Sequence, residues 1–204
     1  MLAKGSKEPI LVSIGLAILF ILSSSLFRIP IFIFISILGV LQLIFVVYFF
    51  RDPDRNVPEN NMIVSPADGK IHVLDRSKNE IEIFMNIWDV HVNRSPWSGK
   101  IETMKQINGG YSPAFSKNSN SNERQLYVLS TEEGDIDIWQ ISGIFARRII
   151  PYVKKDDQIT RGQKIGMIRF GSRVKLKFHN GVDFSVQKGE RVKAGETILG
   201  NWDE

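Results

Sequence analysis

Residues 135–141 read Asp-Ile-Asp-Ile-Trp-Gln-Ile, and residues 80–86 begin in the same way with Glu-Ile-Glu-Ile. The alternation of polar and apolar side chains at residues 135–138 and 80–83 places one set on each face of a β-strand, and it does not fit the 3.6-residue period of a helix. Similar short runs, separated by turn residues, occupy residues 70–74, 100–107 and 125–130. The sequence therefore predicts a mostly β domain from about residue 62 to the C-terminus.

Two glycine-containing stretches of this domain resemble each other. Residues 157–166 read Asp-Gln-Ile-Thr-Arg-Gly-Gln-Lys-Ile-Gly, and residues 190–200 read Glu-Arg-Val-Lys-Ala-Gly-Glu-Thr-Ile-Leu-Gly. Each reads as a charged turn followed by a short strand that ends in glycine. The pattern is similar to the hairpins of biotinyl and lipoyl carrier domains, so we expect a flattened β-barrel or sandwich-like fold with carrier-domain-like hairpins. The lysine tripeptide of a carrier is absent, and the repeat therefore predicts architecture rather than an acylation site.

The N-terminal part of the chain has a different character, because residues 9–27 and 29–50 contain no charged side chain. Helices of about 18–20 residues, at about 1.5 Å per residue, reach across the roughly 30 Å hydrocarbon core of a bilayer. A signal peptide and a buried core hairpin are the alternatives, but a signal peptide has one short apolar run and here a second follows at once. The sequence predicts a transmembrane α-hairpin with helices at about 10–27 and 31–50.

The charge distribution separates the same two parts. The chain has a formal net charge of +4 and a pI near 9.3, which alone would suggest an anionic partner such as nucleic acid. Residues 1–51 hold four basic residues and one acidic residue, so most of the excess surrounds the apolar segment. The positive-inside rule then places both ends of the hairpin in the cytoplasm. We expect a cell-membrane anchor at 1–51, a linker at 52–61, a cytoplasmic β domain at 62–204, and no nucleic-acid partner.

Few side chains of the β domain can carry chemistry. The chain has no cysteine, which excludes a disulfide framework, a thiolate metal site and a cysteine nucleophile. Its three histidines, His72, His91 and His179, lack the short spacing of a zinc site, so no metal cofactor is expected. The Gly-x-Ser-x-Gly motif of serine hydrolases is also missing. The polar segment 116–122 is interpreted as a loop, with a lid over a site as the alternative.

Gly171 and Ser172 stand between two strand-like runs, residues 164–170 and 173–178. A Gly-Ser pair at such a point, taken alone, indicates an ordinary β-turn. Its sequence context favours a second interpretation, because it belongs to a set of five motifs.

The five motifs occur in the order seen in the short class of phosphatidylserine decarboxylases, a class that includes archaeal enzymes acting on archaetidylserine. They are Ser-Pro-Ala-Asp-Gly at 65–69, Asp-Val-His-Val-Asn-Arg-Ser-Pro at 89–96, Asn-Glu-Arg at 122–124, Ala-Arg-Arg-Ile at 146–149 and Arg-Phe-Gly-Ser-Arg-Val at 169–174. The apolar N-terminus and the sequence Phe-Phe-Arg-Asp-Pro-Asp-Arg at 49–55 also resemble that family. The resemblance thus covers almost the whole chain.

This resemblance implies that the chain is a proenzyme that makes its own cofactor. The hydroxyl of Ser172 would attack the carbonyl of Gly171 and convert the amide to an ester, and β-elimination would release a chain that ends at Gly171. The other chain, 172–204, would begin with a pyruvoyl group, which forms a Schiff base with the amine of a serine headgroup and accepts electrons as carbon dioxide leaves. No external cofactor is implied, and the chains 1–171 and 172–204 would remain partners.

The resemblance also implies roles for other residues. His91 is the expected proton donor in decarboxylation, because imidazole groups exchange protons near neutral pH. Asp68 is expected to assist self-cleavage by orienting or activating a base near Ser172. Longer members of the family carry a second histidine where this chain has Arg94. Whether His91 serves both reactions, or Asp68 acts without it, is therefore left open.

The implied substrate is a membrane phospholipid with a serine headgroup, either phosphatidylserine or archaetidylserine. Arg94 could bind its phosphate or carboxylate, since a guanidinium holds either group bidentately, and Arg147 and Arg148 are weaker candidates for this role. The alternative function is a non-catalytic, membrane-anchored β-barrel adaptor or carrier-like binding module, which gives no reason for these site residues to occur together. The sequence leaves open the lipid tail and the formation of a homo-oligomer.

Overall fold

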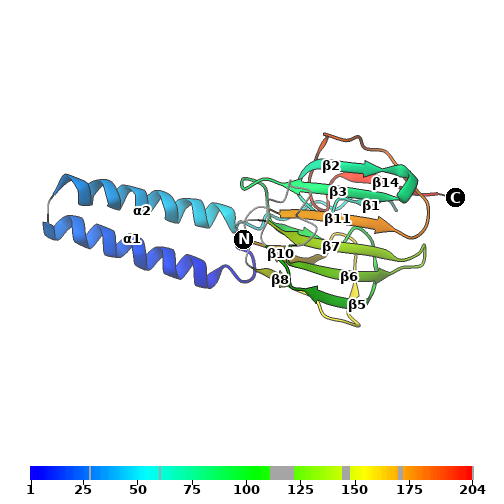
Figure 1. Cartoon of the computed structure of the whole chain (residues 1–204), viewed down its shortest axis with the longest axis horizontal. Helices are drawn as coiled ribbons and strands as arrows, with labels where there is room; N and C mark the ends of the chain where they lie inside the picture. The colour runs from blue at the N-terminus through cyan, green and yellow to red at the C-terminus, as the bar shows by residue number, and fades with distance from the viewer. Residues whose placement is uncertain (28, 60, 111–121, 144–147, 170–171, 204) are drawn as a thin grey trace. The chain divides into compact units, whose positions relative to one another are not determined.

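The computed structural model describes residues 1–203 except 28, 60, 111–121, 144–147 and 170–171. The chain divides into two compact units, Met1–Pro53 and Asp54–Glu204. The first unit is a pair of α-helices, and the second is built almost entirely from β-strands (Figure 1).

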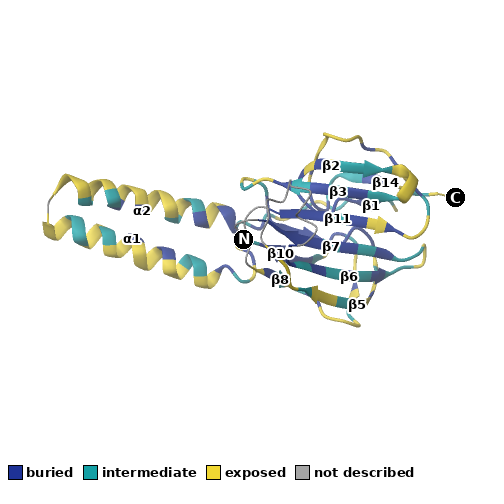
Figure 2. Cartoon of the chain, viewed as in Figure 1, coloured by how far each residue is buried: buried dark blue, intermediate teal, exposed yellow. Residues whose placement is uncertain are grey.

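The two helices, α1 (Lys7–Phe27) and α2 (Pro30–Phe49), form an antiparallel hairpin in which most of the large apolar residues are exposed (Figure 2). Ser36 Oγ of α2 donates a hydrogen bond to the carbonyl oxygen of Phe20 in α1 at 2.6 Å. Most of the buried residues of the two helices are small, since the set consists of Ser13, Ala17, Ser36, Gly39, Val46 and Phe49. A helix pair in water buries its leucines and isoleucines, whereas helices in lipid use small and polar residues at their interface. The hairpin has the second pattern.

The β domain contains fourteen strands within its described residues, and together they form three sheets. Their bounds are β1 (Ile63–Val64), β2 (Gly69–Asp75), β3 (Glu80–Met85), β4 (Val92–Arg94), β5 (Gly99–Ile107), β6 (Arg124–Ser130), β7 (Ile136–Ser142), β8 (Ile149–Pro151), β9 (Gln158–Ile159), β10 (Lys164–Ile168), β11 (Ser172–Phe178), β12 (Val182–Phe184), β13 (Arg191–Val192) and β14 (Ile198–Trp202). A 3-10 turn, η1 (Arg76–Lys78), connects β2 to β3.

The largest sheet has eight strands in the order β13-β2-β3-β11-β7-β6-β5-β9 (Figure 1). Two smaller sheets have the orders β1-β14-β12 and β4-β10-β8. Strand β11 is internal to the large sheet and pairs antiparallel with β3 on one side and with β7 on the other. The start of β11 therefore lies at the same end of the sheet as the ends of β3 and β7.

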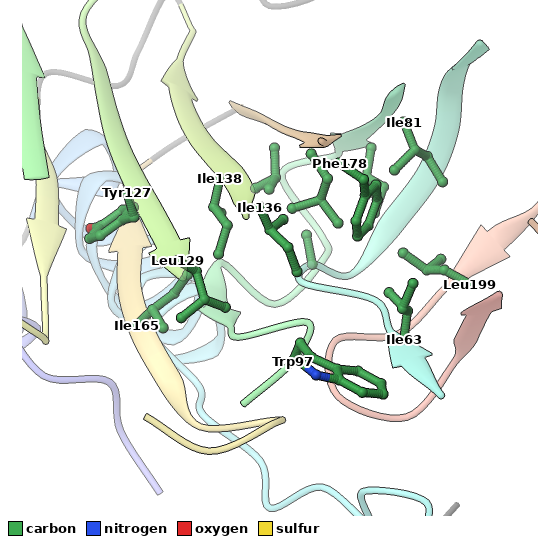
Figure 3. Close-up of a cluster of buried hydrophobic side chains, with 14 of the residues drawn as sticks. Ile63, Ile81, Trp97, Tyr127, Leu129, Ile136, Ile138, Ile165, Phe178 and Leu199 are labelled. Carbon is green, nitrogen blue, oxygen red and sulfur yellow. The ribbon is translucent and has the colours of Figure 1, made fainter. Parts of the chain in front are cut away.

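The hydrophobic core lies on one face of the large sheet (Figure 3). Alternate residues of β3, β7 and β11 point into it, including Ile81, Ile138 and Phe178. The other face carries charged pairs between neighbouring strands, such as Arg173 with Glu82 at 2.7 Å. The alternation seen in the sequence thus corresponds to one buried and one charged face, as expected for an antiparallel sheet.

Two turns of the β domain share one geometry, and we call residues 65–68 the Ser65 turn and residues 95–98 the Ser95 turn. In each, the serine hydroxyl donates to the carbonyl two residues later, from Ser65 to Ala67 at 2.8 Å and from Ser95 to Trp97 at 2.6 Å. The turns also bond to each other reciprocally through backbone groups, as Arg94 N to Pro66 O at 2.9 Å and Val64 N to Pro96 O at 3.1 Å.

The repeated stretches of the sequence close these turns. The amide of Gly195 donates to the carbonyl of Ser65, and the amide of Gly162 donates to the carbonyl of Ser95, both at 2.8 Å. Their φ angles are 74° and 76°, in the left-handed region that glycine adopts without steric cost. The interpretation of the repeat as architecture agrees with this geometry.

The prediction of a mostly β domain that follows an N-terminal α-helical hairpin in the sequence is confirmed. The described strands form open, flattened sheets rather than a closed barrel. The helices begin at Lys7 and Pro30, slightly earlier than expected, because lysine and glutamate favour helix and proline is well accommodated in the first helical turn.

Candidate active site

Ser172 is the first residue of β11, and it lies opposite Met85 of β3 and Ser142 of β7. It is fully buried, and the alternation along β11 places its side chain on the core face together with Val174. Gly171, the expected partner in cleavage, lies outside the described residues.

The hydroxyl of Ser172 is a buried nucleophile. Within the described part of the chain its Oγ has no hydrogen-bond partner, and the same holds for Oγ of Ser142 opposite it. Leaving a buried polar group unbonded costs about 1–3 kcal/mol, and such groups in native proteins call for a functional explanation. A serine that reacts with the neighbouring peptide bond needs no access from solvent. The burial of Ser172 therefore suits a reaction within the chain.

His91 is fully buried just before β4. Its Nδ1 lies 2.9 Å from the carbonyl oxygen of Asp89. Because a carbonyl can only accept, Nδ1 carries the hydrogen of this bond, and Nε2 of the neutral ring has the lone pair that takes up a proton. The carbonyl of His91 accepts from the amide of Ile168 at 3.3 Å, which fixes the histidine to the last residue of β10.

A chain of buried polar side chains leads to the neighbour of Ser172. The Tyr127 hydroxyl donates to Gln140 Oε1 at 2.8 Å, and Gln140 Nε2 donates to Asn93 Oδ1 at 2.8 Å. Asn93 Nδ2 in turn lies 3.3 Å from the sulfur of Met85. Burial raises the pKa of Tyr127, so its hydroxyl stays protonated and acts as the donor. Since Met85 lies opposite Ser172, the chain ends beside the candidate nucleophile.

Asn93, Gln140 and Ser142 are not among the site residues that the sequence predicts. A signal for two of them was present, because Gln140 and Ser142 continue the inward-facing positions of β7 after Ile136 and Ile138. Polar residues at inward positions of a strand are unusual unless they are hydrogen-bonded or functional. The partners of these residues come from distant segments, so the signal did not show what they contact.

The Asn-Glu-Arg motif supports the strand end opposite Ser172. Asn122 Nδ2 donates to the carbonyl of Ser142 at 2.7 Å, and the amide of Ser142 donates to the carbonyl of Glu123 at 3.0 Å. Both backbone groups of Ser142 are thereby bonded, which holds this residue at its place in the sheet.

Asp68 forms an ion pair with Arg55, which the sequence did not indicate as a site residue. Both carboxylate oxygens accept from Arg55 Nη2, at 2.9 and 2.8 Å, and Oδ1 also accepts from the amide of Ala194 at 2.8 Å. The side chains of Arg55 and Asp68 are 7% and 13% exposed, so this is a largely buried ion pair. Arg55 also lies 3.5 Å from Glu196. The expected role of Asp68 in self-cleavage stays a prediction.

The arginines expected to bind substrate occupy different surroundings. Arg94 is buried, and its Nη1 donates to the carbonyl of Gly162 at 2.9 Å, so that part of its guanidinium holds a glycine turn. Arg148 is exposed, and its carbonyl accepts from the amide of Arg169 at 3.2 Å. Arg147 lies outside the described residues. Substrate binding by these arginines stays a prediction.

The mostly β domain has a buried serine at the start of the internal strand β11 and a buried histidine bonded to β10, the strand that precedes β11. This arrangement indicates an enzyme of the self-processing class. The family model of phosphatidylserine decarboxylase matches residues 43–200 of the chain. The chain belongs to the phosphatidylserine decarboxylase family, as its motifs indicated.

Relatives of the chain include both archaeal and bacterial proteins. An archaetidylserine decarboxylase proenzyme of Methanosarcina mazei is 44% identical over 98% of this chain and 96% of its own length. A protein of the same name from Archaeoglobus fulgidus is 48% identical over 80% of this chain and 82% of its own. A phosphatidylserine decarboxylase proenzyme of Streptomyces avermitilis is 43% identical over 74% of this chain and 72% of its own.

Proposed function

We propose that the chain is a self-cleaving proenzyme that decarboxylates a serine-headgroup phospholipid. The observation that carries this proposal is the fully buried Ser172, whose Oγ has no hydrogen-bond partner among the described residues and which directly follows Gly171 in the sequence. Membership of the family, and relatives named as decarboxylase proenzymes, support the same function.

Self-cleavage would proceed in three steps, namely ester formation, β-elimination and hydrolysis. Ser172 Oγ forms a bond to the carbonyl carbon of Gly171 while the peptide C–N bond breaks, and the hydroxyl proton moves to the nitrogen of Ser172. Loss of the Cα proton of Ser172 then breaks its Cβ–O bond and leaves Gly171 with a free carboxylate. One water molecule finally replaces the nitrogen of residue 172, which leaves as ammonia. The products are chain 1–171 and chain 172–204 with a pyruvoyl N-terminus.

The surroundings of Ser172 fit a pyruvoyl group that would form at this position. The pyruvoyl group would supply a carbonyl that binds the substrate amine and accepts electrons as carbon dioxide leaves. The buried apolar residues near Ser172, Met85 of β3 and Val174 of β11 among them, limit the access of water to this position. His91, which holds a hydrogen on Nδ1, would deliver a proton from Nε2 to the carbon that has lost carbon dioxide. Arg94 would hold an anionic group of the substrate.

We further propose that the hairpin anchors the enzyme in the cell membrane with the β domain in the cytoplasm. Helices of 21 and 20 residues are long enough to cross, since each residue adds about 1.5 Å against a core of roughly 30 Å. Lys4 precedes the hairpin, Lys7 is the first residue of α1, and Arg51 follows α2, which favours cytoplasmic ends. An anchored enzyme can act on a headgroup while the lipid tails stay in the bilayer, where each methylene is stabilised by about 0.8 kcal/mol.

The variant Ser172→Ala tests the proposal directly. The wild-type chain should appear on denaturing gels as fragments 1–171 and 172–204, and mass spectrometry should find the smaller fragment blocked at its N-terminus by a pyruvoyl group. Ser172→Ala should remain a single chain and release no carbon dioxide from the lipid substrate, because it lacks the nucleophile. Ser130→Ala, a strand serine at the other end of the sheet, should be cleaved like the wild type. An intact wild-type chain would instead support a non-catalytic adaptor.

The lipid tail is tested separately with the cleaved wild-type enzyme. Carbon dioxide release is measured from phosphatidylserine and from archaetidylserine in matched mixed micelles. Activity on both would show that the enzyme recognises the shared headgroup, and activity on one would identify the tail as part of the recognition.

A further inference from the structure

Trp88 differs from every other large apolar side chain that is described in the β domain. It is 59% exposed, and within the described residues of Asp54–Glu204 no other large hydrophobic residue belongs to the exposed class. The remaining tryptophans, Trp97, Trp139 and Trp202, are buried or partly buried. An exposed tryptophan in water is unfavourable, whereas the amphipathic indole ring is stabilised at a membrane interface.

Trp88 lies at the Ser172 end of the large sheet. It follows Met85 of β3 by three residues and precedes His91 by three, and Met85 is the residue opposite Ser172. Trp202 lies at the other end, where its ring contacts that of Phe178, the last residue of β11, at a centroid distance of 5.5 Å. The exposed indole thus lies at the same end of the large sheet as Ser172.

The turn that carries Trp88 is held in a defined shape. The amide of Asn86 donates to Asp89 Oδ2 at 2.7 Å, and the amide of Asp89 donates to the carbonyl of Asn86 at 2.9 Å. These bonds enclose residues 86–89, which we call the Trp88 turn. A braced turn loses little conformational entropy when its tryptophan docks.

Basic side chains accompany the Trp88 turn. Arg191 Nη2 lies 3.5 Å from Asp89 Oδ1, while its side chain stays 69% exposed. Arg191 in β13 lies opposite Lys70 in β2, which is also exposed. Exposed lysine and arginine beside an interfacial tryptophan are attracted to anionic headgroups.

We propose that Trp88, together with Lys70 and Arg191, docks the Ser172 end of the β domain onto the lipid surface of the bilayer. The inference rests on the proposed membrane location of the hairpin, and it adds a second contact made by the β domain itself. The indole ring enters the interface between headgroups and acyl chains, and the two cations contact phosphates. Docking holds the Ser172 end of the β domain at the depth of the substrate headgroup.

The test uses the fluorescence of the full, self-cleaved chain in bilayer nanodiscs with brominated acyl chains. All four tryptophans of the chain lie in the β domain, so quenching by bromine reports this domain and not the hairpin. Trp88→Phe is compared with Trp202→Phe, which removes a tryptophan at the opposite end of the sheet. Wild type and Trp202→Phe should show clear quenching, and Trp88→Phe should lose most of it.

A kinetic readout accompanies the quenching. Trp88→Ala should raise the KM for substrate embedded in the bilayer and leave kcat/KM for a water-soluble short-chain substrate unchanged. Normal cleavage at Gly171–Ser172 in both Trp88 variants would show that they fold. Quenching of Trp88→Phe equal to that of the wild type, or no quenching of the wild type, would overturn the proposal. Either result would leave the proposed reaction intact, because cleavage and turnover of the soluble substrate are measured independently.

Discussion

At the scale of single residues, the hydrogen bond of His91 determines which of its nitrogens can exchange a proton. The carbonyl of Asp89 accepts from Nδ1, so proton transfer is left to Nε2. Because this carbonyl belongs to the preceding turn and the ring is fully buried, the histidine has little freedom to reorient. A fixed tautomer is what a positioned acid or base requires.

We expect His91→Gln to separate the two reactions of the proenzyme. The glutamine amide can still donate to the Asp89 carbonyl, but it cannot exchange a proton, so decarboxylation should fall by about 10²–10⁴-fold. The measurement is carbon dioxide release per molecule of cleaved enzyme, with cleavage quantified by mass spectrometry. An uncleaved variant would show that His91 serves self-cleavage as well. Unchanged decarboxylation would remove His91 from the reaction.

At the scale of structural elements, the Ser65 and Ser95 turns suggest an interpretation of Asp68. Asp68 follows Ser65 by three residues and accepts from the amide of Ala194, while Ser98 follows Ser95 by three and accepts from the amide of Arg161 at 2.9 Å. The carboxylate therefore repeats a bond that a neutral hydroxyl makes in the related turn. What its charge adds is the pair with Arg55, which ties the linker to the β domain.

We therefore expect Asp68→Asn mainly to lower the free energy of unfolding. The amide oxygen can still accept from Ala194, but Arg55 would lose its main charge partner while 7% exposed. Loss of one member of a buried pair costs about 3–5 kcal/mol, and we expect the lower end because Glu196 remains near Arg55. The free energy of unfolding is measured with denaturant in a Ser172→Ala background, where every chain is uncleaved.

Ser98→Ala is the matched control, since it removes only a neutral hydrogen bond and should cost about 1 kcal/mol. The double variant Arg55→Gln with Asp68→Asn should recover part of the loss, because no unpaired charge stays buried. Asp68→Asn is also made in the chain that retains Ser172. If it blocks cleavage there without lowering stability, the carboxylate acts in self-cleavage, as the family resemblance implies.

At the scale of the whole molecule, self-cleavage would divide the large sheet between two chains without opening it. The chain 172–204 contains β11 to β14, and β11 pairs on both sides with strands of chain 1–171. Its other strands β13 and β14 pair with β2 and β1. The core side chains of β11, Val174, Leu176 and Phe178, are almost completely buried. Separation would expose this apolar surface to water, which costs a free energy of about 25 cal/mol per Å².

We therefore expect the two chains to copurify. A tag at the N-terminus should retain chain 172–204 through extensive washing in mild detergent, and denaturant should release it. The uncleaved Ser172→Ala chain is the reference for complete retention. Loss of the small chain under native conditions would contradict the pairing of β11 inside the sheet.

Much of the fold follows from local patterns in the sequence. The uncharged runs predict the hairpin, and the alternation at residues 80–83 and 135–138 predicts β3 and β7, because a two-residue period and a long apolar run have immediate consequences for burial. The family motifs, rather than periodicity, selected Ser172 and His91. Local pattern alone would have assigned Gly171-Ser172 to a turn.

Three features therefore follow from local sequence patterns and motifs: the division into an apolar hairpin and a β domain, the approximate position of most strands, and the family. The three-dimensional structure was needed to show that Ser172 lies opposite Met85 and Ser142, that Gln140 bonds to Asn93, and that Asp68 pairs with Arg55 and accepts from Ala194. It was also needed to show that Trp88, three residues after Met85, is exposed. The reason is physical: periodicity reports which face of a strand is buried, whereas strand order and side-chain partners depend on contacts between residues far apart in the chain.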